Sequence, residues 1–295
     1  MHTCKRPAEP IVVREVAANT QDQYSPAMSV DRTAATRIWV ATRDIIRLLV
    51  RHHDAYLTDQ DLKRLRITCT DLDLNTGKPA DGGEVFIRPF SIARIREILE
   101  RTKPWLYYEL LDEKDSMPMI AAMEIMSCLL GCLVHDGDNE STPLFMEAHW
   151  NTRDMDYDEG EKLCRSERYE NYEPEWRVEE VLDKQDGSTP HVSCLLADNA
   201  PLKDGQLSNA EIWCILAITN RRLQLNEYHN HRIFPVTVIS AADRQLRIVQ
   251  GYVDGRDGHL RVRKSPILDF EKFNMERVEL VLSWCVGEPV GHTGP

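Results

Sequence analysis

The stretch HNHRIFPVTVISAADRQLRIVQGYVDGRDGHLRVRKSPILDFEKFNMERVELVLSWCVGEPVGHT, from His229 to Thr293, decides the fold. Its first part consists of short runs rich in Val and Ile, separated by the turn-forming segments AADRQ and DGRDGH. Runs of this kind, joined by short turns, pair antiparallel with their neighbours. The pattern therefore predicts a three-stranded antiparallel meander over residues 233–240, 246–253 and 260–264.

The same stretch closes with a predicted helix. Asp269 can serve as its N-cap, because a carboxylate oxygen accepts hydrogen bonds from the free N–H groups of a first helical turn. Val278, Val281 and Cys285 then recur at helical spacing and share one face. We expect this face to pack on the sheet.

Upstream, apolar residues recur at helical spacing and predict three further helices, over residues 33–52, 91–102 and 117–134. The last of these approaches a membrane span in length. Pro118, Glu124 and Ser127 interrupt it, however, and we expect a buried helix instead.

A capping box marks the start of another helix. Ser208 and Glu211 have the spacing at which the two side chains reciprocally satisfy free backbone donors, and the helix should run toward Leu225. Together the elements predict an α+β fold, with a helical N-terminal half and a C-terminal three-stranded antiparallel meander flanked by helices. We expect a flexible N-terminal segment over residues 1–30 and a single α+β domain over residues 31–295.

The negative charge is concentrated in one segment. Of the 48 acidic and 36 basic residues, 19 acidic and 7 basic ones lie between Asp136 and Asp204, so this segment carries the whole net charge of −12. We expect an acidic surface excursion there, at about residues 136–204. A solvated face is its simplest role. The functional alternative is a site that attracts a metal, an amine or a guanidinium, with Asp154, Asp156 and Asp158 as candidate substrate-binding residues.

Length and composition indicate a folded, cytoplasmic protein. A chain of 295 residues with 42% hydrophobic content can bury a core, and its N-terminus lacks the apolar centre of a signal peptide. The 8 cysteines are scattered and none lies in a CxxC pair, which predicts reduced thiols and no metal site. The acidic total argues against duplex DNA as a partner, and no membrane partner is expected. No complete cofactor motif is present, so no cofactor is assigned.

Three residues form the candidate catalytic set. His229 and His231 alternate just before a predicted strand, and two imidazoles on one side can hold a metal or move a proton. Asp254, at the end of the second strand, can join them. The structural alternatives are hydrogen-bonded histidines at a strand edge and an aspartate that forms a turn. Arg261 and Arg263 alternate with apolar residues in the third strand, which predicts a basic face that either binds phosphate or faces water.

The runs HRIFPVTVIS, LRIVQGYVDG, DFEKF and WCVGEPVGHT resemble the C-terminal part of a broad group of uncharacterised fungal proteins, some of them encoded near specialised-metabolite genes. In size, and in lacking familiar motifs, the chain also resembles the fungal arginine-containing cyclodipeptide synthases. That resemblance implies an enzyme that binds charged tRNA, with a basic patch at Arg261, Arg263 and Lys264 and an acidic pocket for the arginine side chain. The DDxxE motif of those enzymes has no counterpart here, since the chain contains no adjacent Asp-Asp pair.

These observations favour a cytosolic biosynthetic enzyme of fungal specialised metabolism that acts on a small substrate. The substrate is cationic if the acidic residues bind it, and aminoacyl transfer from charged tRNA to form an arginine-containing cyclodipeptide is the specific case. A non-catalytic interaction protein, which recruits a basic partner through its acidic segment, is the alternative from another class. A metal-dependent nuclease is the third hypothesis.

Overall fold

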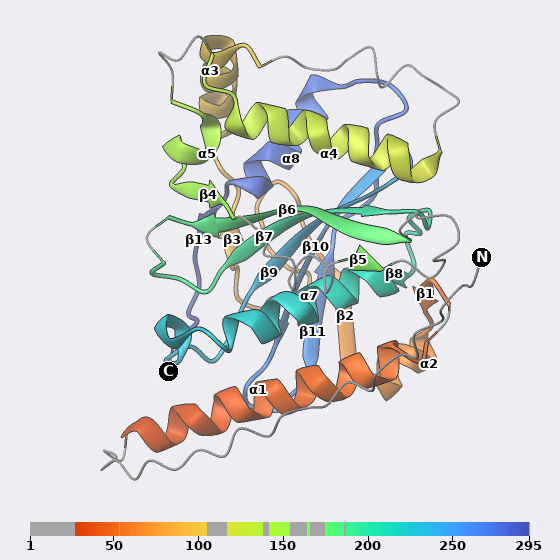
Figure 1. The fold of residues 1–295 in the computed structure, drawn as a ribbon, viewed down its shortest axis with the longest axis vertical. Coiled ribbons are helices and arrows are strands. Elements are labelled where there is room, and N and C mark those ends of the chain that lie inside the picture. Colours follow the sequence, from red (N-terminus) through yellow and green to blue (C-terminus); the bar gives the residue numbers. More distant parts are fainter. Residues whose placement is uncertain are drawn as a thin grey trace, which may run out of the picture.

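The computed structural model describes residues 27–52, 54–104, 117–137, 142–153, 164–165, 175–185 and 187–294. One face of a large sheet carries four helices: α3 (Ile92–Thr102), α4 (Pro118–Val134), α5 (Leu144–Glu147) and α8 (Met275–Cys285). The opposite face carries α1 (Ala27–Leu49) and α7 (Asn209–Arg222). Figure 1 shows the resulting three layers, with the sheet between α4 and α8 on one side and α7 and α1 on the other. Two short helical segments, α2 (Asp59–Arg64) and the 3₁₀ helix η2 (Asn226–Tyr228), lie outside these layers.

The sheet is mixed and contains nine strands in the described part of the chain, in the order β2-β11-β10-β9-β7-β6-β4, with β12 beside β10 and β5 beside β6. Its strands are β2 (Ile67–Asp71), β4 (Trp150–Thr152), β5 (Cys164–Arg165), β6 (Trp176–Lys184), β7 (Val192–Asp198), β9 (Val236–Ala242), β10 (Gln245–Val253), β11 (Leu260–Lys264) and β12 (Leu268–Asp269). Two short pairs stand apart from it: β1 (Tyr56–Leu57) with β8 (Leu207–Ser208), and β3 (Ile87–Arg88) with β13 (Glu288–Pro289).

Both faces of the sheet are buried, and this explains the composition of its central strands. All seven residues of β7, and all seven of β9, are buried. In β7, Leu195 packs in the cluster beneath α4 and α8, whereas its neighbours Cys194 and Leu196 pack in the cluster beneath α7. Strands covered on both sides are apolar throughout rather than alternating.

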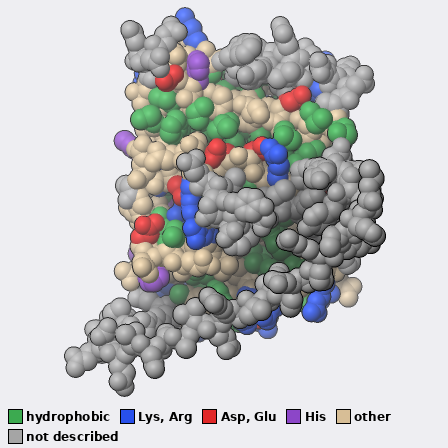
Figure 2. Space-filling view, viewed as in Figure 1, with side chains coloured by type: hydrophobic (Ala, Val, Ile, Leu, Met, Phe, Trp, Pro, Cys, Tyr) green, Lys and Arg blue, Asp and Glu red, His purple; other side chains and the backbone are tan. Residues whose placement is uncertain are grey.

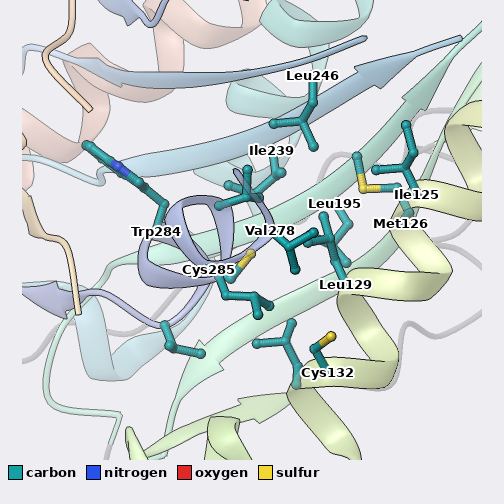
Figure 3. Packing of buried hydrophobic residues seen from close by; sticks show 14 of the residues in the cluster. Ile125, Met126, Leu129, Cys132, Leu195, Ile239, Leu246, Val278, Trp284 and Cys285 are labelled. Carbon is teal, nitrogen blue, oxygen red and sulfur yellow. The ribbon is translucent and has the colours of Figure 1, made fainter. Parts of the chain in front are cut away.

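The core on the α4 side joins residues that are far apart in the sequence. Figure 3 shows Leu129 of α4 near Leu195 of β7, with Ile239 of β9 and Val278 of α8 beside them. Nine residues of α4 are buried, which confirms the prediction of a buried helix over 117–134. One strip of α4 is exposed at Ile120 and Val134, and Figure 2 shows hydrophobic side chains on the surface at the level of this helix. No helix in the described part of the chain is long and apolar enough to cross a membrane.

The predicted fold class was wrong. The three strands of the meander exist, as β9, β10 and β11, but they are the middle of a larger sheet. The N-terminal half contributes β2, which pairs parallel with β11, and the acidic segment contributes β6 and β7, of which β7 pairs parallel with β9. The architecture is therefore mixed α/β, not an α+β fold with a helical N-terminal half.

The last helix begins later than predicted. Its N-cap is Asn274, whose side-chain oxygen accepts a hydrogen bond from the backbone N–H of Arg277 at 3.1 Å. Asp269 ends β12 and accepts instead from the N–H of Glu271, so it forms a turn ahead of the helix. The predicted capping box at Ser208 and α7 is confirmed.

Candidate functional site

An acidic pocket lies at the carboxyl end of β7. Its volume is about 260 Å³, close to the lower limit of about 300 Å³ for small-molecule sites. The residues that line it come from four separated parts of the chain: Asp54, Ala55, Glu175, Trp176, Asp198, Asn199, Ala200, Asn209 and Ala210. Strand β7 leads through the crossover helix α7 to the parallel strand β9, and ligands of such sheets bind beyond the carboxyl ends of the strands. The pocket therefore has both the position and nearly the size of a ligand site.

Asp198, the last residue of β7, is the chemically distinctive residue of this pocket. Only 4% of its surface is exposed, and its Oδ1 accepts a hydrogen bond from the backbone N–H of Ala200 at 3.0 Å. Burial raises the pKa of Asp198 to about 7, and the charges of Glu211 and Glu175 act in the same direction, against the hydrogen bond from Ala200. A carboxyl group that titrates near neutral pH can both accept and return a proton, as general acid–base catalysis requires.

A buried ion pair fixes the helix that closes the pocket. Glu211 is the third residue of α7, and its two carboxylate oxygens accept hydrogen bonds from Nε and Nη2 of Arg247 at 2.7 and 2.5 Å. The same carboxylate accepts from the backbone N–H of Ser208, and Arg247 Nη1 donates to the carbonyl of Lys203. The first turn of α7 is thereby tied to β10 and to the preceding loop.

Asn209, the first residue of α7, lines this pocket and has one unsatisfied acceptor. Its backbone N–H donates to the carbonyl of Ala55 at 2.8 Å, and its Nδ2 donates to the carbonyl of His52 at 3.3 Å. Its Oδ1 is buried and has no hydrogen-bond partner among the described residues, although the residue is only 5% exposed. A buried amide oxygen without a donor is costly, so a ligand N–H placed here would be favoured.

Aromatic side chains support the pocket wall. Trp176, the first residue of β6, is buried and packs against Trp213 of α7 with ring centroids 6.3 Å apart. On the strand pair β1–β8, the Tyr56 hydroxyl donates to the carbonyl of Pro201 at 2.5 Å, and Lys203 Nζ lies 3.7 Å from the centroid of the Tyr56 ring. These contacts hold the loop between β7 and β8 in place.

The polar groups of the lining suit an organic cation. Asp54, Glu175 and Asp198 supply carboxylates, Asn209 supplies an amide oxygen, and Trp176 supplies an aromatic ring. Ammonium and guanidinium groups donate hydrogen bonds to such oxygens and are attracted by aromatic faces. Within the described residues, no three His, Cys, Asp or Glu side chains are grouped so as to hold a metal ion.

The predicted catalytic residues lie elsewhere, toward the opposite end of the sheet. His229 is exposed after η2. The Nδ1 of His231 lies 2.8 Å from the Thr293 hydroxyl, and its ring packs on Tyr228. Asp254 is buried after β10. No hydrogen bond or ion pair joins either histidine to Asp254 within the described residues.

Asp254 is engaged by arginines. Its carboxylate accepts hydrogen bonds from Arg256 Nε and Nη2 at 3.1 and 2.9 Å and lies 3.4 Å from Arg261 Nε. Burial opposes ionisation of Asp254, but the hydrogen bonds and charge of Arg256, together with the charge of Arg261, outweigh it and keep the pKa below its ordinary value. Asp254 therefore neutralises arginine charge at this turn.

The two predicted basic residues of β11 differ in environment. Arg261 is half-buried and pairs with Asp257 at 2.7 Å. Arg263 is 1% exposed, and its guanidinium lies 5.3 and 5.6 Å from the ring centroids of Phe86 and Tyr252. Arg263 is thus covered, whereas about a third of the Arg261 side chain is exposed to solvent. Asp154, Asp156 and Asp158 lie outside the described residues.

Arg263 belongs to a row of polar side chains that crosses the sheet. The strand register pairs each member with the next across β7, β9, β10, β11 and β2: Ser193, Thr237, Gln250, Arg263 and Thr70. Only weak hydrogen bonds link neighbours in this row, at 3.4 Å between Gln250 and Thr237 and 3.5 Å between Arg263 and Gln250. The alternation of Arg261 and Arg263 with apolar residues could not reveal this row, because it depends on strands far apart in the sequence.

The chain matches no protein-family model, and comparisons with curated proteins and with solved structures find no significant similarity.

Proposed function

We propose that this protein is a cytoplasmic biosynthetic enzyme that binds a small organic cation in the acidic pocket at the end of β7 and uses Asp198 to move a proton. One observation carries the proposal: three acidic residues line a single pocket of about 260 Å³ together with Asn209, whose buried Oδ1 has no hydrogen-bond partner among the described residues. A pocket that offers mainly acceptors selects a ligand that offers donors.

Four residues of the lining have roles in this proposal. Glu175 and Asp54 hold the positive charge of the substrate, and the Oδ1 of Asn209 accepts one of its N–H groups. Asp198, in its ionised form, accepts a proton from the substrate amine or from a nucleophile beside it. The aminoacyl transfer that forms an arginine-containing cyclodipeptide is one reaction of this class, and it would place the arginine guanidinium in this pocket.

Ligand selectivity tests the binding half of the proposal. Thermal unfolding of the full chain should be followed with arginine, agmatine and spermidine, and with citrulline as the neutral analogue of arginine. We expect the unfolding midpoint to rise with the concentration of at least one cation and not with citrulline. The rise should be lost in Glu175→Gln and retained in Asp59→Asn, which removes an exposed carboxylate outside the pocket.

Turnover tests the catalytic half. The protein should be incubated with a metabolite pool and with charged tRNAs, and its products followed by mass spectrometry. We expect Asp198→Asn to lower product formation by about 10²–10⁴-fold, the usual contribution of a general acid or base, while the variant still unfolds cooperatively. Binding of no cation to the wild type, or full turnover in Asp198→Asn, would contradict the proposal.

A further inference from the structure

A second pocket, of about 290 Å³, lies between α1 and the segment that leads from α2 into β2. Three arginines line it: Arg37 of α1, Arg64 at the end of α2, and Arg66 just before β2. The strands β2 and β11 begin beside this pocket, whereas β7, which runs in the same direction, ends at the acidic pocket. The two pockets therefore lie toward opposite ends of these strands.

The carboxylates that line this second pocket lie close to arginines outside its lining. Asp44 lies 3.7 Å from Arg43 and 3.7 Å from Arg47. Asp257 accepts from Arg261 Nη2 at 2.7 Å. Neither carboxylate pairs with an arginine of the lining in the described structure, so the three lining guanidinium groups give the pocket an excess of positive charge.

None of the three guanidinium groups pairs with a carboxylate of the lining in the described structure. Arg37 Nη1 donates to the carbonyls of Gly255 and Arg256 at 3.0 and 2.6 Å. These neutral acceptors fix the position of the guanidinium group but do not compensate its positive charge. Arg64 pairs with Asp61 at 3.3 Å at the surface, an exposed contact of small energy. Arg66 takes part in no salt bridge among the described residues.

The floor of this pocket is apolar. Ile45 of α1 and Leu65 are buried there, and Val40 and Leu48 are half-buried beside them. A ligand that fits the whole pocket thus presents an anionic group to the arginines and an apolar body to the floor.

The backbone at Arg66 fixes the direction in which the chain passes from α2 into β2. Its φ of 56° lies in the left-handed region, which glycine adopts freely and an arginine adopts at a cost. The carbonyl of Arg66 accepts from the N–H of Leu260 at 3.1 Å, so the parallel strand pair fixes this conformation. Arg66 directly follows the C-cap of α2, a position at which a left-handed residue often ends a helix, and both Arg64 and Arg66 thereby line the pocket.

We propose that this pocket binds a small molecule that carries a phosphate monoester or a carboxylate on an apolar body. Both anionic groups match the planar donor fork of a guanidinium, and both can approach two arginines at once. The proposal is independent of the cation site, because the two pockets share no lining residue and select opposite charges.

Titration calorimetry on the full chain tests this inference, with phenyl phosphate and benzoate as the two anionic probes. Benzyl alcohol serves as the neutral probe, and inorganic phosphate as the anion without an apolar body. We expect saturable binding of phenyl phosphate, benzoate or both, weakened by added salt, and no binding of benzyl alcohol. The tighter of the two anionic probes identifies the group that the site prefers.

Arg66→Gly provides a variant that retains the fold, because glycine favours the backbone conformation found at this position. We expect Arg66→Gly, and separately Arg64→Gln, to weaken binding of the preferred probe at least tenfold. Arg88→Gln, which removes an exposed arginine outside this pocket, is the matched control and should bind as the wild type does. Asp198→Asn should also bind as the wild type does, which separates this site from the proposed function.

Three results would overturn the inference. The first is that neither anionic probe binds the wild type. The second is that the preferred probe binds Arg66→Gly and Arg64→Gln as well as it binds the wild type. The third is that inorganic phosphate binds as tightly as phenyl phosphate, which would mean that the apolar floor contributes nothing.

Discussion

Glu211 and Arg247 form a bidentate ion pair whose side chains are both fully buried between α7 and β10. A buried pair of this kind contributes little relative to an apolar pair of the same shape, but losing one partner leaves a charge without compensation. The pair therefore acts mainly as a geometric constraint, which sets the position of the first turn of α7 and of Asn209 at the acidic pocket.

Removal of either charge of this pair should be strongly destabilising. We expect Glu211→Gln or Arg247→Met to lower the free energy of unfolding by about 3–5 kcal/mol, because the remaining charge stays buried. The double variant Glu211→Met with Arg247→Met should recover much of that loss. Urea unfolding at pH 7 measures all three, and a single variant within about 1 kcal/mol of the wild type would show that the pair is not buried as described.

Asp198 should make the stability of the protein depend on pH. Its pKa in the folded state is about 7, well above the value of an unfolded aspartate, so the folded state retains a proton that the unfolded state releases. This contribution to stability is complete at about pH 4 and is lost as the pH rises toward 7. Asp198→Asn removes the effect, so we expect the variant to become more stable than the wild type at pH 8, by an amount on the order of 4 kcal/mol at most.

Urea unfolding of the wild type and Asp198→Asn between pH 4.5 and 8 measures this difference. It should grow steadily with pH, and a difference that is constant across the range would mean that Asp198 is ionised throughout. We expect Asp198→Asn to lose turnover as well. The Asp198 carboxyl would then be needed for activity while lowering the free energy of unfolding at neutral pH.

His191 should act in the opposite direction. It is buried, its Nε2–H donates to the carbonyl of Val290 at 3.1 Å, and burial lowers its pKa to about 4 despite that hydrogen bond, with the charges of His231 and Arg222 adding to the lowering. As the pH falls below about 6.5, the imidazole of His191 binds a proton in the unfolded state but stays neutral in the folded state. The free energy of unfolding therefore decreases as the pH falls from about 6.5 toward 4.

Between about pH 4 and pH 6.5 the contributions of Asp198 and His191 oppose each other. We expect His191→Gln, which retains an N–H donor for the Val290 carbonyl, to show a stability that falls with rising pH more steeply than that of the wild type in this interval. Thermal unfolding midpoints of the wild type, both single variants and the double variant give the test. Parallel pH profiles for the wild type and His191→Gln would contradict the assignment of a neutral, buried His191.

The parts of the fold that could be predicted are the local ones. The capping box at Ser208, the helix of residues 92–102 and the strands around AADRQ and DGRDGH depend on neighbouring residues, and the structure has all of them. The parallel pairs β7–β9 and β2–β11 were missed because each joins segments separated by a helix or by much of the chain. Strand β6 was not predicted because of its acidic residues. Glu179, Glu180 and Asp183 made this strand, which lies near an edge of the sheet, look like part of an acidic loop.

The acidic pocket was missed for the same reason. Asp198 looks like any other carboxylate of the acidic segment, and its raised pKa arises from burial and from Glu211, which only the folded chain provides. Asp54 and Asn209, which complete the pocket, lie far from one another in the sequence. One local signal was present in the sequence. An apolar strand ends in Asp198 and Asn199, and a capped helix follows it after a loop. Ligand sites commonly lie at this end of a strand in such units.

Gly251 allows α7 to lie close to β10. A Cβ atom at this position would lie 2.6 Å from Cδ1 of Ile215, closer than side-chain atoms approach, and at a tight 3.1 Å from its Cγ2. We expect Gly251→Ala to lower the free energy of unfolding by about 1–3 kcal/mol through overpacking, and Ile215→Val alone to lower it by about 0.5–1.5 kcal/mol. Because Val lacks the Cδ1 atom, the double variant should lose less than the sum of the two single losses. Urea unfolding of the four proteins completes the cycle, and strictly additive losses would show that the helix can move away from the strand without cost.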